Sequence, residues 1–365
     1  MGRTDGIRYG PRPIDLDILF YGNHTINTDI LTIPHERIQE RPFVMAPLVD
    51  LFGSDIDDYA IKLENIFSKR SGGLLETWEK LGGESLVGKD GMQRVVPIAN
   101  QLRNLSSKTS IMGILNVTPD SFSDGGKYLS MQSAVSQVQL MLLEGADIID
   151  LGAQSTRPMA SKLSAEEELD RLIPVLEAVK VAAEAVNKGA HLVNDVSSGQ
   201  LDSSMHSVVA TLKVPYIAMH MRGDPSTMQN SENLEYNDVC KEVAYELYKR
   251  DYYRSGNWIL EEYRAKFGHP CGIASHSSEI ARRSLAVSHA PLLIGPSRKR
   301  FLGEVCGRPA AAERDPATIA AVTSGVLGGA NIVRVHNVKD NRDAVKLCGA
   351  MMERKRSYPC NGKHN

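Results

Sequence analysis

From Thr109 onward the chain repeats one pattern, a short apolar run of strand length followed at once by a polar segment. The first run, Ile111–Val117, leads into TPDSFSDGG, and later runs are DIIDL, HLVND, VPYIAMH, PLLIG and NIVRVH. A single such unit is equally typical of an ordinary strand and turn. Six units in series, with helical stretches between several of them, favour a parallel (β/α)8 barrel of the TIM type.

Signals for helix ends lie between these strands. Ser164 and Glu167 have the spacing of a capping box, and Gly145 predicts the end of the helix that precedes DIIDL. Asp315 and Pro316 predict the N-cap and first residue of the helix before the last strand. The strand and helix signals therefore agree on one alternating α/β architecture.

In such a barrel the polar segments after the strands converge on one face. Cations and amides outnumber carboxylates among them, which favours an anionic ligand such as a pyrophosphate with Mg²⁺. Each residue taken alone also has a structural explanation, as a satisfied core group or, for Arg157 and Arg298, as solvated surface. The converging set is Asn116, Asp124, Thr156, Arg157, Asn194, His220, Lys299, Arg334 and His336.

The first fifty residues form a separate unit. In PIDLDILF, strand alternation places Asp15 and Asp17 on one face, roughly 7 Å apart at Cα. Two carboxylates so close favour Mg²⁺ that carries the phosphates of a nucleotide. The alternative is the solvated face of an edge strand.

Composition narrows the function classes. The 42 basic and 44 acidic residues nearly balance, so no basic excess favours nucleic acid or an anionic membrane. No apolar run approaches the ~18 residues of a membrane span. The five cysteines are scattered, odd in number and without metal-site spacing, which indicates free thiols in a reducing compartment. We expect no nucleic-acid partner and no membrane partner.

The N-terminal motifs GPRPIDLDILFYG and IPHERIQERPFVMAPL resemble the C-terminal half of 6-hydroxymethyl-7,8-dihydropterin pyrophosphokinase, over residues of about 3–50. The resemblance implies a partial ferredoxin-like α+β segment in which Asp15 and Asp17 hold Mg²⁺ on ATP. It also implies that Arg12, His35 and Arg41 contact the nucleotide. Because the N-terminal half of that family has no match here, we expect little kinase activity from this segment alone.

The later motifs GILNVTPDSFSDGG, STRP, VNDVS, MHM, IGPSRKRFLG and RVHNV resemble dihydropteroate synthase, from about Ser110 to Met352. That family joins 6-hydroxymethyl-7,8-dihydropterin diphosphate to p-aminobenzoate and releases pyrophosphate. By matched position, Asn116, Arg334 and His336 would hold pyrophosphate and Mg²⁺. Asn194 would hydrogen-bond the pterin, with Lys299 beside it, and Met219 and Ser297 would also bind substrate. The p-aminobenzoate site would be covered by Phe122, Asp124, Thr156, Arg157 and Pro158. The implied catalytic residues are Asp124, Lys299, Arg334 and His336.

Two pieces of the synthase pattern have no counterpart. A third strand of the type ISVDT is missing between Val179 and Val186, and DPGIGFSK is missing between Arg254 and Ser278. Each carries an Asp that, in the family, grips the pterin, and an unpaired buried donor costs ~1–3 kcal/mol. We therefore expect pterin binding to be weaker by about 10²–10⁴-fold. GNWILEE is a candidate for the sixth strand, and no segment is a candidate for the third.

The predicted layout is a kinase segment at 1–52, a linker or peripheral segment at 53–108, the barrel at 109–356 and a tail at 357–365. The resemblance to plant fusions of the two enzymes implies a homodimer and a mitochondrial location. The N-terminus shows no presequence, so the cytoplasm is the alternative. Two other functions stay open: a non-catalytic or mis-spliced product that binds pyrophosphate or a partner, and a pterin-binding barrel of the methyltransferase kind.

Overall fold

The computed structural model describes residues 16–22, 24–52, 73–86, 92–93, 95–98, 101–105, 108–117, 131–153, 163–182, 191–202, 204–212, 214–224, 227, 230–233, 235–238, 241–243, 245–246, 258–262 and 291–357. The chain forms two compact units, Met1–Met92 and Gln93–Asn365. This division lies between the boundaries at 52 and 108 that the sequence suggested.

The first unit is built around two helices, α1 (Pro42–Phe52) and α3 (Leu74–Leu81). Met45 and Trp78 are fully buried and belong to one apolar cluster that joins the helices. The other elements are the antiparallel pair β1 (Ile26–Asn27) and β2 (Thr32–Ile33), and the 3₁₀ turns η1 (Ile38–Glu40) and η2 (Gly83–Leu86).

The predicted strand over PIDLDILF is wrong in its described part. Residues 16–20 are not in a strand, and Leu16 and Ile18 are 67% and 51% exposed. A strand requires a neighbour for its backbone hydrogen bonds. In the described part of this unit, the β1–β2 ladder is the only pairing and does not include this segment.

The second unit contains a seven-stranded sheet in which every neighbouring pair is parallel. The strand order is β6-β5-β11-β10-β9-β8-β7. Their bounds are β5 (Ser110–Asn116), β6 (Ile148–Gly152), β7 (Val193–Asp195), β8 (Tyr216–Met219), β9 (Trp258–Glu262), β10 (Leu292–Ile294) and β11 (Ile332–Val335). An antiparallel hairpin, β3 (Val96–Ile98) and β4 (Gln101–Arg103), precedes the sheet. The barrel class expected from the sequence is confirmed.

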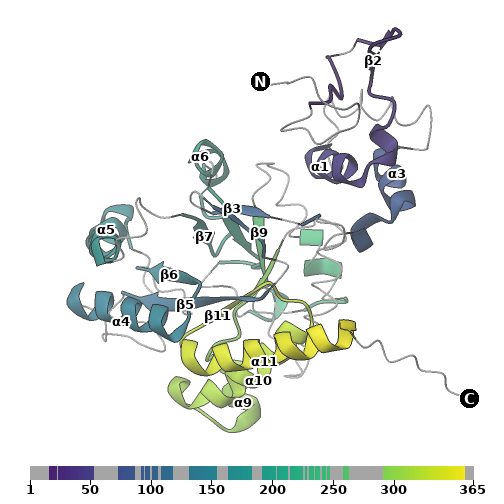
Figure 1. Ribbon diagram of the computed structural model, residues 1–365. Coiled ribbons are helices and arrows are strands. Elements are labelled where there is room, and N and C mark those ends of the chain that lie inside the picture. The colour runs from purple at the N-terminus through teal and green to yellow at the C-terminus, as the bar shows by residue number, and fades with distance from the viewer. Residues whose placement is uncertain are drawn as a thin grey trace, which may run out of the picture. The chain divides into compact units, whose positions relative to one another are not determined.

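Helices alternate with these strands along the chain, and α4 and α11 pack on β5 (Figure 1). The helices are α4 (Met131–Glu144), α5 (Ala165–Ala182), α6 (Met205–Leu212), α9 (Arg300–Cys306), α10 (Asp315–Leu327) and α11 (Val338–Ser357), with 3₁₀ turns η3 (Ser231–Asn233) and η4 (Ala311–Arg314).

The predicted helix ends agree closely with the structure. The Ser164 backbone N–H donates to the Glu167 carboxylate at 2.9 Å, and the Glu167 N–H donates back to Ser164 Oγ at 3.2 Å, which confirms the capping box. Gly145 follows α4 with a φ of +99°, where L-residues are strained. Asp315 is the first residue of α10 rather than its N-cap, a shift of one position.

Two strand positions bear on the missing segments. β9 pairs with both β8 and β10, so GNWILEE does fill the sixth position, as expected. Strands β6 and β7 are the two ends of the sheet, and among the described residues no strand lies between them. We call this opening, at the place of the third strand, the β6–β7 gap.

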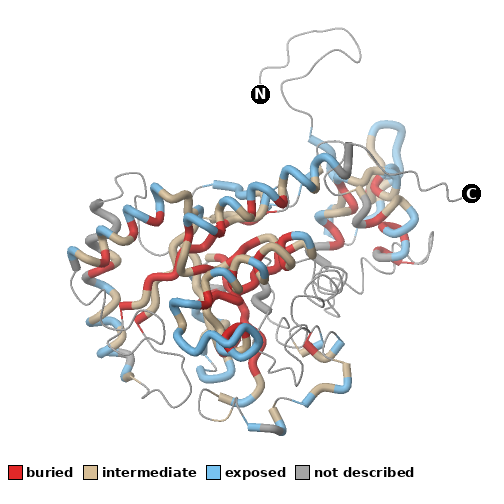
Figure 2. Tube along the Cα trace, turned by 90° about the horizontal axis from the view of Figure 1, so that it is seen from below, coloured by how far each residue is buried: buried red, intermediate tan, exposed pale blue. Residues whose placement is uncertain are grey.

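Burial follows the strands. All three residues of β10 and all four of β8 are buried, as expected for a parallel sheet covered on both faces. The buried segments run along the strands, and exposed segments lie on the outer faces of the helices (Figure 2). Among the described residues, no helix has the length and apolar character that crossing a bilayer requires.

Candidate active site

Asp150 joins two predicted site residues. It lies on β6, and its Oδ2 accepts from Arg334 Nε on β11 at 2.7 Å and from Arg334 Nη2. Its Oδ1 accepts from Asn194 Nδ2 on β7 at 3.1 Å. The Asp150 side chain is only 11% exposed, so the pair forms in a largely buried place where it is weakly screened.

The chemistry of Asp150 fixes the amide of Asn194. A carboxylate paired with a guanidinium can only accept hydrogen bonds, so Asn194 must turn its NH₂ group toward it. The Asn194 Oδ1 then faces away from Asp150. It is shielded from solvent and has no hydrogen-bond partner among the described residues. Such an acceptor suits a ligand that brings an N–H group.

Ser297 and His336 form a second pair at the ends of β10 and β11. The His336 backbone N–H donates to Ser297 Oγ at 3.1 Å, and the same Oγ lies 2.9 Å from His336 Nδ1. When Nδ1 accepts from the Ser297 hydroxyl, Nε2 carries the ring hydrogen; when Nδ1 instead donates to Ser297 Oγ in the neutral ring, Nε2 is an acceptor. The tautomer in which Nδ1 accepts and the charged form both place an N–H on Nε2, which suits an anion.

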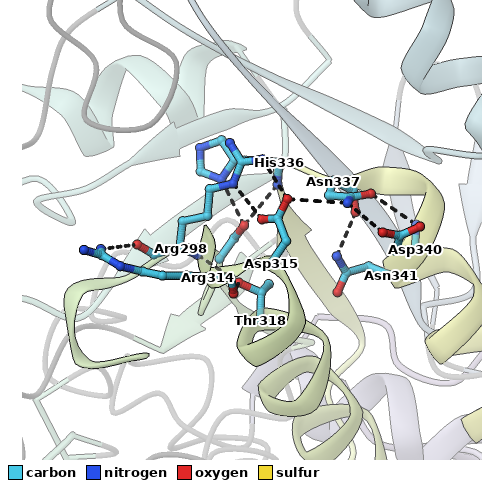
Figure 3. A network of polar contacts seen from close by, with 9 residues as sticks. Arg298, Arg314, Asp315, Thr318, His336, Asn337, Asp340 and Asn341 are labelled. Atoms are coloured by element: carbon cyan, nitrogen blue, oxygen red, sulfur yellow. Dashed lines mark hydrogen bonds and ion pairs between the residues drawn. The ribbon is translucent and has the colours of Figure 1, made fainter. Parts of the chain in front are cut away.

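The backbone at Arg298, which directly follows Ser297, is held by a network of hydrogen bonds and ion pairs (Figure 3). Arg298 has a left-handed φ of +55°, which costs a non-glycine residue about 1–3 kcal/mol. Its side chain pairs with Asp315 at two points, and its backbone N–H donates to Thr318 Oγ1 at 3.0 Å. Arg298 is 12% exposed, so the alternative of a solvated surface residue is wrong. Its role is to shape the backbone between Ser297 and Lys299.

His220 and Arg222, which follow β8, belong to a third cluster. His220 is fully buried and lies 2.8 Å from Glu246, while Arg222 pairs with Glu246 and Glu242 and stacks 3.9 Å above the Tyr236 ring. Burial opposes ionisation of Glu246, but hydrogen bonds from His220 and Arg222 prevail and lower its pKa to about 2. These contacts explain both residues structurally.

The remaining predicted residues divide into two groups. Asn116 ends β5, Met219 ends β8 and is 7% exposed, and Lys299 occupies the N-cap position of α9. These therefore lie at strand ends or just beyond them, as expected. The predicted p-aminobenzoate site lies outside the described residues: Phe122, Asp124, Thr156, Arg157 and Pro158.

The donor set at the strand ends bears on the predicted Mg²⁺. Among the described residues no group of three or more His, Cys, Asp or Glu side chains is arranged to hold a metal. Asn116 Oδ1 lies close to Gly152, the last residue of the neighbouring strand β6. A Cβ at Gly152 would lie 3.3 Å from this oxygen, so the glycine leaves space beside it. Asp150 on the neighbouring strand is already paired. These residues fit a Mg²⁺ that arrives on the oxygens of a diphosphate, because Mg²⁺ commonly keeps waters and few protein ligands.

In the first unit, three predicted kinase residues lie together. Arg41 Nη1 donates to the Asp17 carboxylate, and His35 Nε2 lies 3.9 Å from Asp17 Oδ2. The hydrogen bond from Arg41 is the main cause that lowers the pKa of Asp17. Arg12 and Asp15 lie outside the described residues.

Sequence reasoning missed the residues that hold the site together. Asp150 is the second of two aspartates in DIIDL, and this segment was predicted only as a buried strand. Asp315 looked like a helix cap, although its carboxylate pairs with Arg298. A charged residue inside a predicted buried strand was the available signal, since such residues are seldom buried without a partner.

Comparison with known proteins identifies two families along the chain. The sequence profile of the pterin binding enzymes matches residues 112–336. The profile of 7,8-dihydro-6-hydroxymethylpterin-pyrophosphokinase matches residues 1–53. The order agrees with the two resemblances found in the sequence.

Solved structures resemble the second unit. Dihydropteroate synthase from Yersinia pestis, in a sulfonamide drug complex, has a TM-score of 0.64 and 30% identity, covering 71% of this chain and 100% of that one. The enzyme from Xanthomonas albilineans with 4-aminobenzoic acid has a TM-score of 0.60 and 30% identity, covering 72% and 99%.

Full-length relatives span both units. The mitochondrial folate synthesis bifunctional protein of Pisum sativum is 61% identical over 98% of this chain and 75% of its own length. Its counterpart in Arabidopsis thaliana is 57% identical over 98% and 70%. The pea alignment runs over 388 positions, and 388 − 365 = 23, so at least 23 of them have no residue in this chain. This chain belongs to the bifunctional folate synthesis family, in which dihydropteroate synthase is fused to the pterin pyrophosphokinase.

Proposed function

We propose that the barrel of this chain condenses 6-hydroxymethyl-7,8-dihydropterin diphosphate with p-aminobenzoate and releases pyrophosphate. The observation that carries the proposal is the joint placement of Arg334, Asn194 and His336 at the ends of neighbouring or facing strands. Arg334 and Asn194 share one carboxylate, and His336 is oriented by Ser297. Guanidinium and imidazole groups suit the diphosphate, and the amide suits a pterin ring.

The diphosphate would bind at the β11 end. Arg334 has a guanidinium held in a fixed plane by Asp150, and His336 would donate from Nε2–H in the tautomer whose Nδ1 accepts from Ser297. Helix α11 begins just after His336, and its N-cap is Asn337, whose Oδ1 accepts from the Asp340 N–H at 3.2 Å. The positive end of that helix dipole would add to the attraction of the anion.

The pterin would lie beside Asn194, whose shielded Oδ1 would accept from a ring N–H. Lys299, at the N-cap of α9, and Met219, at the end of β8, would lie along the same ring. Ser297 would contribute indirectly, through His336. We assign p-aminobenzoate to Phe122, Asp124, Thr156, Arg157 and Pro158 by matched position in the family.

The reaction breaks the bond between the pterin methylene carbon and the diphosphate oxygen. The electron pair leaves on the diphosphate, where Arg334, His336 and Lys299 would stabilise the charge that develops. Mg²⁺, when bound with the substrate through Asn116, would neutralise further negative charge on the leaving group. The amine of p-aminobenzoate then forms the new C–N bond and loses a proton. Exclusion of water by the substrate loops would prevent the carbon from being trapped as an alcohol.

In the first unit, Asp15 and Asp17 with Arg12, His35 and Arg41 would bind Mg²⁺ and ATP. The cluster of Asp17, His35 and Arg41 supports this assignment. We further assign residues 1–52 to the kinase segment and 109–356 to the synthase. The family suggests a homodimer, and the names of the pea relative and of one Arabidopsis relative suggest a mitochondrial location.

The deciding experiment is dihydropteroate formation by the purified full chain. Pterin diphosphate, p-aminobenzoate and Mg²⁺ are supplied, and the product is measured by chromatography while pyrophosphate release is measured in parallel. We expect both products in equal amounts and neither with the double variant K299A/R334A. Absence of both products from the unmodified chain would reject the synthase and leave the non-catalytic alternative.

A further inference from the structure

The two ends of the open sheet are joined by a side-chain contact. Strands β6 and β7 share no backbone ladder, since each is a terminal strand of the sheet. Across the β6–β7 gap, Asp150 Oδ1 accepts from Asn194 Nδ2 at 3.1 Å. The two residues are 44 positions apart in sequence, so the contact is tertiary.

Asp150 is suited to this task because both of its partners are donors. Its second oxygen accepts from Arg334 at two points, so one carboxylate links β6, β7 and β11. The carboxylate pairs with a guanidinium in a largely buried place, where hydrogen bonds between ionic groups are stronger than neutral ones. An amide in its place would turn a donor toward either Arg334 or Asn194.

The neighbouring carboxylate on β7 is engaged differently. Asp195 accepts from the Ser197 and Gly199 backbone N–H groups and from the Tyr216 hydroxyl, at 2.6–2.8 Å. These three contacts lie within β7, the turn that follows it and β8, and none of the three crosses the gap. The bridging role therefore follows from the position of Asp150 and not from the mere presence of a carboxylate.

We propose that Asp150 is a positioning residue that clamps the β6–β7 gap and orients two ligand-binding groups, the Asn194 amide toward the pterin and the Arg334 guanidinium toward the diphosphate. The ligand part rests on the proposed function. The clamp itself does not, because it is a contact within the protein. This separation allows the two parts to be tested independently.

The test compares Asp150→Asn with the unmodified chain by two readouts. The first is amide hydrogen exchange of the full chain without ligand, which reports local opening. We expect faster exchange in β6 and β7, with little change in β10 and in the hairpin β3–β4. The second is calorimetric affinity for the pterin diphosphate and for Mg²⁺-pyrophosphate. We expect each affinity to fall by about 10- to 100-fold, because the amide has one acceptor oxygen in place of two and cannot hold both Asn194 and Arg334 in their present orientations.

Asp147→Asn is the matched control. Asp147 immediately precedes the same strand, at its opposite end, and its Oδ2 accepts from the Ile111 N–H at 2.9 Å. This variant also exchanges a carboxylate for an amide and loses a hydrogen bond. It is expected to leave exchange at the β7 end of the gap and both ligand affinities unchanged. Equal effects of the two substitutions would overturn the proposal, since they would indicate general destabilisation.

A second variant separates the Asp150–Asn194 contact from the Asp150–Arg334 contact. It also keeps the proposal testable if Asp150→Asn does not fold. Asn194→Ala removes only the contact across the gap and leaves the Asp150–Arg334 pair. We expect faster exchange in β6 and β7, weaker pterin binding and unchanged affinity for Mg²⁺-pyrophosphate. Unchanged exchange in both variants would reject the clamp. Faster exchange with no binding of the pterin diphosphate by the unmodified chain would support the clamp and reject the proposed function.

Discussion

Arg298 and Asp315 form a two-point ion pair in which Nε lies 2.7 Å from Oδ1 and Nη2 lies 2.9 Å from Oδ2. The pair holds Arg298 in its left-handed backbone conformation, between Ser297 and Lys299. Both side chains are at least four-fifths buried, so neither charge has ready access to water if the other is lost.

Asp315→Asn should therefore destabilise the fold and loosen the segment that carries Lys299. We expect a loss of about 2–4 kcal/mol in the free energy of unfolding, measured by urea denaturation. At temperatures where the variant stays folded, its turnover should still be lower than that of the unmodified chain, because the segment that carries Lys299 is less firmly held. The control is Glu304→Gln, which breaks the exposed Arg300–Glu304 pair on α9. A loss as small as in that control, below about 0.5 kcal/mol, would contradict the structural role of Asp315.

Lys299→Ala and Arg334→Ala should each depress dihydropteroate synthesis strongly. Both cations are assigned to the charge that develops on the leaving diphosphate, and loss of one such group commonly costs about 10²–10³-fold in turnover. The measurement is steady-state pyrophosphate release with saturating p-aminobenzoate. Arg300→Ala, at a residue whose side chain is 73% exposed, is the matched cationic control. Rates equal to the control would remove the assignment of the diphosphate to this face.

The architecture could be predicted because it depends on local periodicity. Short apolar runs, the Ser164–Glu167 cap and the β9 segment all appear in the structure where the sequence placed them. The gap at the third strand was also visible as a missing segment. The exposure of Leu16 and Ile18 could not be predicted from the sequence. Alternation shows which residues share a face, but it does not show whether a neighbouring strand covers that face.

The internal partners of the site could not be predicted. Arg298 resembled a solvated surface residue, and Asp150 resembled an ordinary residue of a buried strand. Each in fact pairs with a residue of another element, 17 and 184 positions away. Spacing shows which residues share a strand end, whereas the choice of partner depends on packing between elements. The motif residues were thus accessible from sequence, and the carboxylates that orient them were not.

Glu246→Gln should weaken the fold and flatten its response to acid. The Glu246 carboxylate faces His220 and Arg222, and Arg222 also pairs with Glu242 and stacks on the Tyr236 ring. Its pKa is lowered from 4.5 to about 2, so its contribution is complete above pH 4.5 and is lost as the pH falls toward 2. We expect the variant to lose on the order of 2 kcal/mol at pH 7, and the difference from the unmodified chain to shrink at pH 3. Urea denaturation at both values measures it, and a difference that is independent of pH would contradict the ion pair.

Mg²⁺ and pyrophosphate should stabilise the chain only together. The strand ends lack a protein-only metal cluster among the described residues, so the ion is expected to bind with the phosphate oxygens. At a ligand concentration 100-fold above Kd, linkage gives about 2.7 kcal/mol, which appears as a rise in Tm. Mg²⁺ alone should give no rise, and EDTA should reverse the effect of the pair. A rise with Mg²⁺ alone, abolished by Asn116→Ala, would show a resident metal site instead.

Restoring a third strand should close the β6–β7 gap and strengthen pterin binding. The insertion would take from the pea relative the segment that matches the family's third strand and place it between α5 and β7. A strand at this place would pair with the outer edges of β6 and β7, the terminal strands of the described sheet, and its Asp would accept from a pterin ring N–H. We expect affinity for the pterin diphosphate to rise by about 10- to 100-fold in calorimetry. The same insertion with that Asp changed to Asn should close the gap, seen as slower hydrogen exchange in β6 and β7, without the gain in affinity. If both insertions raised affinity equally, the effect would come from closure of the sheet, and the absent carboxylate would not be the cause of weak binding.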